Sequence, residues 1–180
     1  MLKIATERLT LRPFQWHDVP AFVAYRSDPE VARFQSWEPT YSRQDGERFF
    51  ASQRHLTFGR PGDWMQLAVV DRVCGALCGD CAVRVATDQP ATAEVGVTFS
   101  PSAQGRGLAS EALAAVIARL FEEHGLHRVF AQADDRNHAV HRLLERLGLR
   151  CEARHVEADR FKGEWTTLRV YAVLGREWRR

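Results

Sequence analysis

The sequence lacks the features that mark secreted and membrane-spanning proteins. Its longest run of apolar side chains, residues 112–118, is far shorter than the ~18 residues that a membrane helix needs. No long apolar stretch followed by a small-residue cleavage site occurs at the N-terminus, so no secretory signal is expected. Low-complexity segments, internal repeats and Gly/Ser linkers are also missing. We therefore predict a cytosolic protein that forms a single domain over residues 1–180.

An excess of charge of one sign is missing as well. The 25 basic residues nearly balance the 23 acidic ones, which leaves a net charge of +2, and the basic residues are scattered. Backbone binding to nucleic acid needs a dense cationic face, so we expect no nucleic-acid partner. With no spanning segment, we expect no membrane partner either. Lysine occurs only at Lys3 and Lys162, a bias that we attribute to genome composition.

The composition that is present fits a globular domain of alternating strands and helices. Apolar residues make up 45% of the chain and charged residues 27%, which matches one ordinary buried core. Periodicity and turn residues predict the order β, α, α, β, β, β, α, β, α, β, β. Strands are expected over residues 8–14, 64–71, 73–85, 91–99, 127–133, 151–158 and 165–174. Helices are expected from Asp18 to about Ser27, from the Ser42–Asp45 capping box to about Gly59, around residues 108–125, and over residues 137–147.

The stretch Gln104–Ala109, Gln-Gly-Arg-Gly-Leu-Ala, lies between a predicted strand and a predicted amphipathic helix. Glycines let a backbone approach a ligand closely, and a turn that opens a helix directs free N–H groups toward one point. That geometry binds a phosphate or pyrophosphate. From the glycines alone, an ordinary strand-to-helix turn is an equal alternative.

Several segments resemble the Gcn5-related N-acetyltransferases (GNAT). Residues 94–99, Glu-Val-Gly-Val-Thr-Phe, with Pro101 and Gln104–Ala109, are similar to the coenzyme A loop of that family, Gln/Arg-x-x-Gly-x-Gly/Ala. Asn137 and the run Leu-Leu-Glu-Arg-Leu-Gly-Leu at 143–149 resemble its later helix. Residues 6–12 and the closing 171–178 look like the branch that acetylates N-termini of ribosomal proteins (RimJ/RimL type).

The resemblance implies an α/β (α+β) fold with a mixed, mostly antiparallel sheet of six or seven strands and about four helices. It implies a splayed parallel pair of strands at the acyl-CoA site, and acetyl-CoA as co-substrate with no metal. The implied activity is transfer of the acetyl group to a primary amine, a protein N-terminus or a small molecule, by direct attack in a ternary complex. The cofactor-binding residues that it implies are Val97, Phe99, Gln104, Gly105, Arg106, Gly107, Leu108, Ala109 and Asn137.

Some of these residues have a simpler structural interpretation. Asn137 is as well suited to cap its helix as to contact the ligand, because Asn is a preferred cap residue. Arg106 is either a solvated charge or a pyrophosphate contact, and the loop favours the contact. Many family members carry a tyrosine as general acid where this chain has Leu144, and Val140 replaces the branch's serine. The proton donor for the departing thiolate is therefore open.

Glu94 is predicted to be the general base. In a strand its side chain points to the face opposite Val95, Val97 and Phe99, a few residues before the expected pantetheine contacts. A carboxylate there can accept the amine proton directly or through one water, and a backbone N–H near Val97 can hold the oxyanion. The alternatives are a solvent-facing strand residue and an electrostatic anchor for the amine.

The resemblance locates the acceptor groove between the early helices and the last hairpin. The residues expected there combine aromatic faces, which suit a cation, with carboxylates: Trp37, Glu38, Tyr41, Phe161, Glu164 and Trp165. Relatives often pair, so we also expect a homodimer.

Three other functions compete with the acetyltransferase. Cys74, Cys78 and Cys81 have the spacing of an iron–sulfur site, but in a strand they cannot converge on one cluster, so we expect reduced, buried cysteines. The run 105–110 nearly matches a dinucleotide fingerprint, but only 70 residues follow it and they end in a hairpin. A non-enzymatic acyl-CoA sensor of the same fold remains an alternative.

Overall fold

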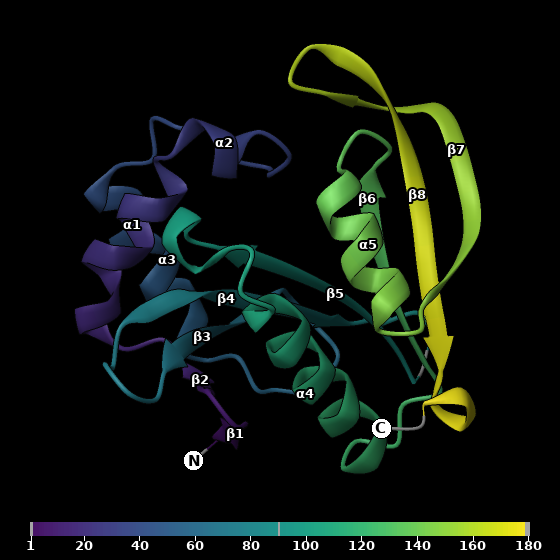
Figure 1. Cartoon of the computed structure of the whole chain (residues 1–180), viewed down its shortest axis with the longest axis horizontal. Helices are drawn as coiled ribbons and strands as arrows, with labels where there is room; N and C mark the ends of the chain where they lie inside the picture. The colour runs from purple at the N-terminus through teal and green to yellow at the C-terminus, as the bar shows by residue number, and fades with distance from the viewer. Residues whose placement is uncertain (1, 90, 179–180) are drawn as a thin grey trace.

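The computed structural model describes residues 2–89 and 91–178, and its centre is one mixed sheet (Figure 1). The strands are β1 (Ile4–Ala5), β2 (Leu9–Pro13), β3 (Met65–Asp71), β4 (Leu77–Val85), β5 (Thr92–Phe99), β6 (Arg128–Asp134), β7 (Arg150–Phe161) and β8 (Glu164–Leu174). The α-helices are α1 (Val19–Arg26), α2 (Pro29–Ala32), α3 (Arg43–Gln53), α4 (Leu108–Glu122) and α5 (His138–Arg146). The expected α+β order is confirmed.

The sheet has the order β1-β2-β3-β4-β5-β6-β8-β7. Among the described strands every neighbouring pair is antiparallel except β5 and β6, which are parallel. The expected six or seven strands are one too few, because the 2-residue β1 adds an eighth. Two residues show no alternation in sequence, so only the pairing of Ile4 with Leu11 identifies this strand.

The number of helices is also one higher than expected in the described chain. The segment Ser27-Asp28-Pro29 does end α1, but Asp28 then accepts hydrogen bonds from the backbone N–H groups of Glu30 and Val31 and opens α2. Asp at the cap and Pro at the first helical position are helix-starting signals. The same residues therefore end one helix and begin the next. Helix α3 begins at the predicted Ser42–Asp45 capping box, but ends earlier than expected, at Gln53.

The helices cover the two faces of the sheet and build two cores. The larger core joins one face to the apolar stripes of α4 and α5, including Val116, Ile117 and Leu144. The smaller core packs Phe22 and Tyr25 of α1 against Phe14 and Ala68 on the opposite face. Figure 1 shows α1, α2 and α3 gathered on one side of the molecule and α5 with the β7–β8 hairpin on the other. Strand β5 runs between these two groups, and β6 lies behind α5 beside β8.

Candidate active site

The parallel strands β5 and β6 separate soon after they meet. They pair only from Thr92 with Arg128 to Glu94 with Phe130, although both strands continue for several more residues. A cavity of about 120 Å³ lies where they have diverged. Its lining comes from both strands, from α4 and α5, and from the segment after α2: Phe34, Gln35, Val95, Gly96, Val97, Leu113, Ala131, Gln132, Ala133, Asp134, Asn137, Val140 and Leu144. The splay predicted from the family resemblance is therefore present.

One edge of β5 is free for a ligand beyond Glu94. Ser100 donates its backbone N–H to Cys78 O, and Ala86 to Thr92 O, so the even-numbered residues of β5 direct their backbone groups toward β4. The backbone groups of Val95 and Val97 consequently face the gap left by β6. No described strand pairs with them there. An extended chain can hydrogen bond to this edge as an added strand does.

The glycine loop lies at the N-terminus of α4. Gly105 and Gly107 have φ angles of 72° and 77°, a left-handed conformation that glycine adopts without strain. Gly107 is the N-cap, and no side chain caps this 15-residue helix, so its first N–H groups are available to an anion. Gln104 donates its side-chain amide to Phe99 O over 2.9 Å and ties the loop to the end of β5. The remaining loop residues contribute mainly backbone, since Leu108 is buried and Ala109 packs against the core.

Of the two predicted contacts Arg106 and Phe99, the first has an exposed side chain and the second a buried one. The guanidinium of Arg106 is 54% exposed and lies 4.0 Å from the Asp71 carboxylate. Backbone hydrogen bonds from Val73 and Cys74, with a smaller effect of Arg106, lower the pKa of Asp71 below its usual value. The Phe99 side chain is buried in the larger core, so only its backbone can meet a ligand.

Asn137 caps its helix as predicted, and its position leaves the predicted ligand contact open. Its Oδ1 accepts a hydrogen bond from the Val140 N–H over 3.3 Å and caps α5, while the residue also lines the cavity. Leu144, at the position of the family's tyrosine, is buried and lines the same cavity. The described part of the cavity lining therefore contains no tyrosine.

Glu94 lies at the point where the strands diverge. Its Oε2 accepts from Arg84 Nη2 over 2.6 Å, and its Oε1 accepts from Gln132 Nε2 over 3.3 Å. The side chain is 12% exposed. Because Gln132 lines the cavity, Glu94 is one hydrogen bond away from it. Arg84 and Gln132 were not identified from the sequence, since only the strand register sets them beside Glu94.

Asp134 is a second carboxylate at the cavity that sequence reasoning missed. It is buried, and it accepts hydrogen bonds from the backbone N–H, Nε and Nη2 of Arg136. The side-chain hydrogen bonds from Arg136 lower the pKa of this carboxyl despite its burial. Arg136 also contacts Glu164 over 3.1 Å. An Asp directly after the strand predicted over residues 127–133, and two residues before an Arg, was the available signal.

The expected acceptor residues fall into two groups in the structure. Trp37 and Tyr41 surround the buried Arg26, whose guanidinium carbon lies 3.6 Å from the centre of the Trp37 ring. Arg26 also lies 3.8 Å from Asp80, which accepts a hydrogen bond from Tyr25. Burial, with the negative charge of Asp80, raises the pKa of Tyr25 well above its usual value. These two aromatic rings are thus partly occupied by the protein's own cation.

The second group meets at the tip of the β7–β8 hairpin. Lys162 donates to the backbone oxygens of Ala32 and Trp37 and lies 3.8 Å from Glu38. The tip therefore reaches the end of α2, as Figure 1 shows. Its flanking residues Phe161, Glu164 and Trp165 include one large exposed aromatic, since Trp165 is 64% exposed.

The cysteines do not form a cluster. Cys74 is exposed and lies in the turn before β4, because β4 begins at Leu77 rather than at the expected residue 73. The expectation that all three are buried is therefore wrong for Cys74 and right for Cys78 and Cys81. In the described chain no three metal-binding side chains gather. Nor does any described helix have the length and apolar character to cross a bilayer.

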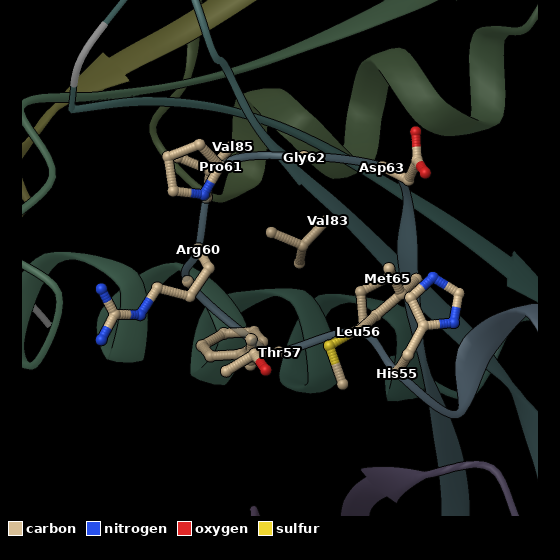
Figure 2. A pocket seen from close by; sticks show the side chains of 12 residues that line it. His55, Leu56, Thr57, Arg60, Pro61, Gly62, Asp63, Met65, Val83 and Val85 are labelled. Atoms are coloured by element: carbon tan, nitrogen blue, oxygen red, sulfur yellow. The ribbon is translucent and has the colours of Figure 1, made fainter.

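A second hollow, of about 190 Å³, lies where β3 begins and β4 ends (Figure 2). It is formed by the loop after α3 with Met65, Val83 and Val85, and the charged ends of Arg60 and Asp63 point away from its centre. None of the site residues expected from the sequence lines it.

Comparison with known proteins identifies the family. The family model for the "Acetyltransferase (GNAT) domain" matches residues 8–150. Bacillus subtilis YnaD, described as an uncharacterized N-acetyltransferase, is 28% identical over 177 residues, 98% of this chain and 99% of that protein. The crystal structure of a GNAT-family acetyltransferase from Bacillus anthracis has a TM-score of 0.87 at 27% identity, over 98% of this chain and 100% of that one. RimL, a ribosomal L7/L12 α-N-protein acetyltransferase solved with coenzyme A, shares the fold at 18% identity and a TM-score of 0.83, over 96% of this chain and 98% of that one.

The chain belongs to the GNAT acetyltransferase family. It is an acetyltransferase that uses acetyl-CoA and transfers the acetyl group to an amine.

Proposed function

We propose that acetyl-CoA lies in the splay between β5 and β6, with its pyrophosphate on the glycine loop. The proposal rests on three features that follow one another along β5 and the loop after it. They are the cavity beyond Glu94, the free backbone edge at Val95 and Val97, and the uncapped start of α4. A pyrophosphate on helix N–H groups is favoured by the helix dipole. The pantetheine arm would hydrogen bond to the β5 edge, and Asn137 would meet it from α5.

We further propose that Glu94 removes a proton from the acceptor amine. The free amine attacks the thioester carbonyl, the C–N bond forms, the C–S bond breaks, and coenzyme A leaves as a thiolate. The second proton that the nitrogen loses on becoming an amide passes through solvent to this thiolate, so the products are the acetylated amine and the thiol. The Val97 N–H, which faces the gap, would hydrogen bond to the oxyanion. A thiol with an ordinary pKa of about 8.5 leaves as thiolate without a strong acid, which fits a site with Leu144 in place of a tyrosine.

The charges around the acceptor side favour an acceptor with a single amino group. The carboxylates expected to attract a cation have basic partners: Glu94 has Arg84 and Glu38 has Lys162, while Glu164 shares Arg136 with Asp134. A polyamine needs several uncompensated carboxylates along its length. We therefore propose a primary monoamine such as a protein N-terminus. The homodimer and the cytosolic location stay predictions.

Calorimetry with acetyl-CoA tests the binding site. Gly107→Glu adds a negative side chain at the loop and should abolish measurable binding. Gly125→Glu is the matched control, because Gly125 follows the other end of α4 and also has a positive φ, 61°. Both substitutions put an L-residue in a left-handed backbone conformation, which should lower the free energy of unfolding by a similar amount, roughly 1–2 kcal/mol. Unchanged affinity in folded Gly107→Glu, or equal loss in both variants, would contradict the proposed site.

A further inference from the structure

Arg8, in the turn between β1 and β2, contacts both the glycine loop and the first turn of α4. Its Nε donates to Glu111 Oε2 over 2.6 Å, and its backbone N–H donates to Glu111 Oε1 over 2.8 Å. Its Nη1 donates to the carbonyl oxygen of Arg106 over 3.0 Å. Three hydrogen bonds from one residue thus join the N-terminal turn to a loop about a hundred residues further along the chain.

The turn that carries Arg8 is itself fixed. Thr6 Oγ1 donates to Glu111 Oε1 over 2.5 Å, and Arg72 Nη1 donates to Thr6 O over 2.6 Å. Partial burial of Glu111 opposes ionisation, but the hydrogen bonds from Thr6 and Arg8 outweigh it and lower the pKa of this carboxyl. Glu111 is therefore a carboxylate at neutral pH whose charge is balanced by Arg8. It does not leave an uncompensated negative charge beside an anion site.

The second terminal nitrogen of Arg8 remains available. Nη2 lies 3.6 Å from the position that a β-carbon on Gly107 would occupy, and it donates no hydrogen bond to the described residues. Gly107 is the N-cap of α4, where no side chain satisfies the first N–H groups. The Arg8 Nη2 group and the free N–H groups of the helix therefore both lie beside Gly107. Arg106, by contrast, lies beside Asp71 and is half-exposed.

We propose that Arg8 is a further cofactor-binding residue, whose Nη2 donates to the pyrophosphate of acetyl-CoA while Nη1 holds the glycine loop in place. The proposal rests on the proposed function and adds to it a contact that the glycine loop alone does not provide. Guanidinium is suited to this task because it is always charged and its donors have a fixed planar arrangement. The Glu111 carboxylate orients that plane before the ligand arrives, which reduces the entropy lost on binding.

The test measures the affinity of four chains for coenzyme A and for dephospho-coenzyme A, which lacks the 3′-phosphate. The chains are the wild type, Arg8→Gln, Arg8→Lys and Arg72→Gln. Arg72→Gln is the matched control. It removes one positive charge near Arg8, and it breaks the hydrogen bonds from Arg72 that hold the turn between β1 and β2. We expect Arg8→Gln to weaken binding about tenfold or more for both ligands, as loss of a charge-assisted hydrogen bond does. Arg8→Lys should recover part of the loss, and Arg72→Gln should bind nearly as the wild type does.

The dependence of affinity on ionic strength gives a second readout. A direct contact with phosphate is screened by salt, so Arg8→Gln should show a weaker salt dependence than the wild type. Equal affinity in Arg8→Gln and wild type would overturn the assignment, as would equal losses in Arg8→Gln and Arg72→Gln. A loss seen with coenzyme A but not with dephospho-coenzyme A would overturn it in favour of a 3′-phosphate contact. Failure of the wild type to bind coenzyme A would overturn the proposed function itself.

Discussion

Glu94 and Arg84 lie directly opposite each other on β5 and β4, and Arg84 Nη2 donates to Glu94 Oε2 over 2.6 Å. The pair stands where β6 leaves β5, so the proposed base is also half of a cross-strand ion pair. A role in catalysis and a role in holding the sheet together predict different behaviour for the two partners. Substituting each partner separately distinguishes the roles.

Glu94→Gln should lower the rate of acetyl transfer at neutral pH by about 10² to 10⁴, the usual contribution of a general base. The rate should recover in part toward pH 10 as the fraction of free amine rises. Arg84→Gln breaks the same ion pair and should keep most of the rate. Steady-state kinetics with a validated acceptor and thermal unfolding of both variants make the comparison. Equal rates in the two variants would show that Glu94 acts only as the partner of Arg84.

Coenzyme A release with a panel of amines tests the acceptor class. Peptides with a free N-terminus and simple monoamines should react faster than spermidine, because the carboxylates on the acceptor side are paired with basic residues. Lys162→Met leaves the Glu38 carboxylate without its partner and should raise the relative rate with spermidine. Spermidine as the best acceptor of the wild-type chain would contradict the monoamine proposal, and no release with any amine would contradict enzymatic activity.

Asn137 allows its two roles to be measured apart. Asn137→Ser keeps a good helix cap but removes the side-chain amide, so stability should change little while the affinity for acetyl-CoA falls. Asn137→Ala removes both, and should also lower the free energy of unfolding by about 1 kcal/mol. Denaturant unfolding and calorimetry on the same preparations give the two quantities. Wild-type affinity in Asn137→Ser would leave Asn137 as a cap alone.

The ion pairs of Asp135 should make the stability of the fold depend on pH in the acid range. Asp135 accepts hydrogen bonds from Arg154 and Arg169, and these lower its pKa from 3.8 to about 2. A carboxyl with a lowered folded-state pKa contributes stability that is complete above pH 3.8 and is lost as the pH falls through about 2. Asp135→Asn should therefore flatten the fall of the unfolding midpoint between about pH 4 and pH 2. Asp88→Asn, at an exposed loop position, is the control and should leave the slope unchanged.

Local patterns in the sequence determined most of the secondary structure and the glycine loop before α4. The leucines of α5, the Ser42–Asp45 capping box and the two glycines before α4 act within a few residues of themselves, so periodicity and turn chemistry reveal them. Reliance on local patterns also explains why β1 and α2 were not predicted. A 2-residue strand has no period, and the residues that end α1 also begin α2.

Only the tertiary structure decided which side chains meet at the site. Arg8 reaches the glycine loop, Arg84 pairs with Glu94, and Lys162 reaches Ala32, although these partners are separated in sequence by 98, 10 and 130 residues. Such contacts depend on strand order and register, and a shift of one residue along β4 would turn Arg84 away from Glu94 to the other face. The sequence alone therefore provided the candidate cofactor loop and the candidate base, which stay predictions. The ion pairs of Glu94, Glu164 and Glu38 depend on how distant segments pack together. These pairs set the net charge that an acceptor amine meets, so only the tertiary structure decided that charge.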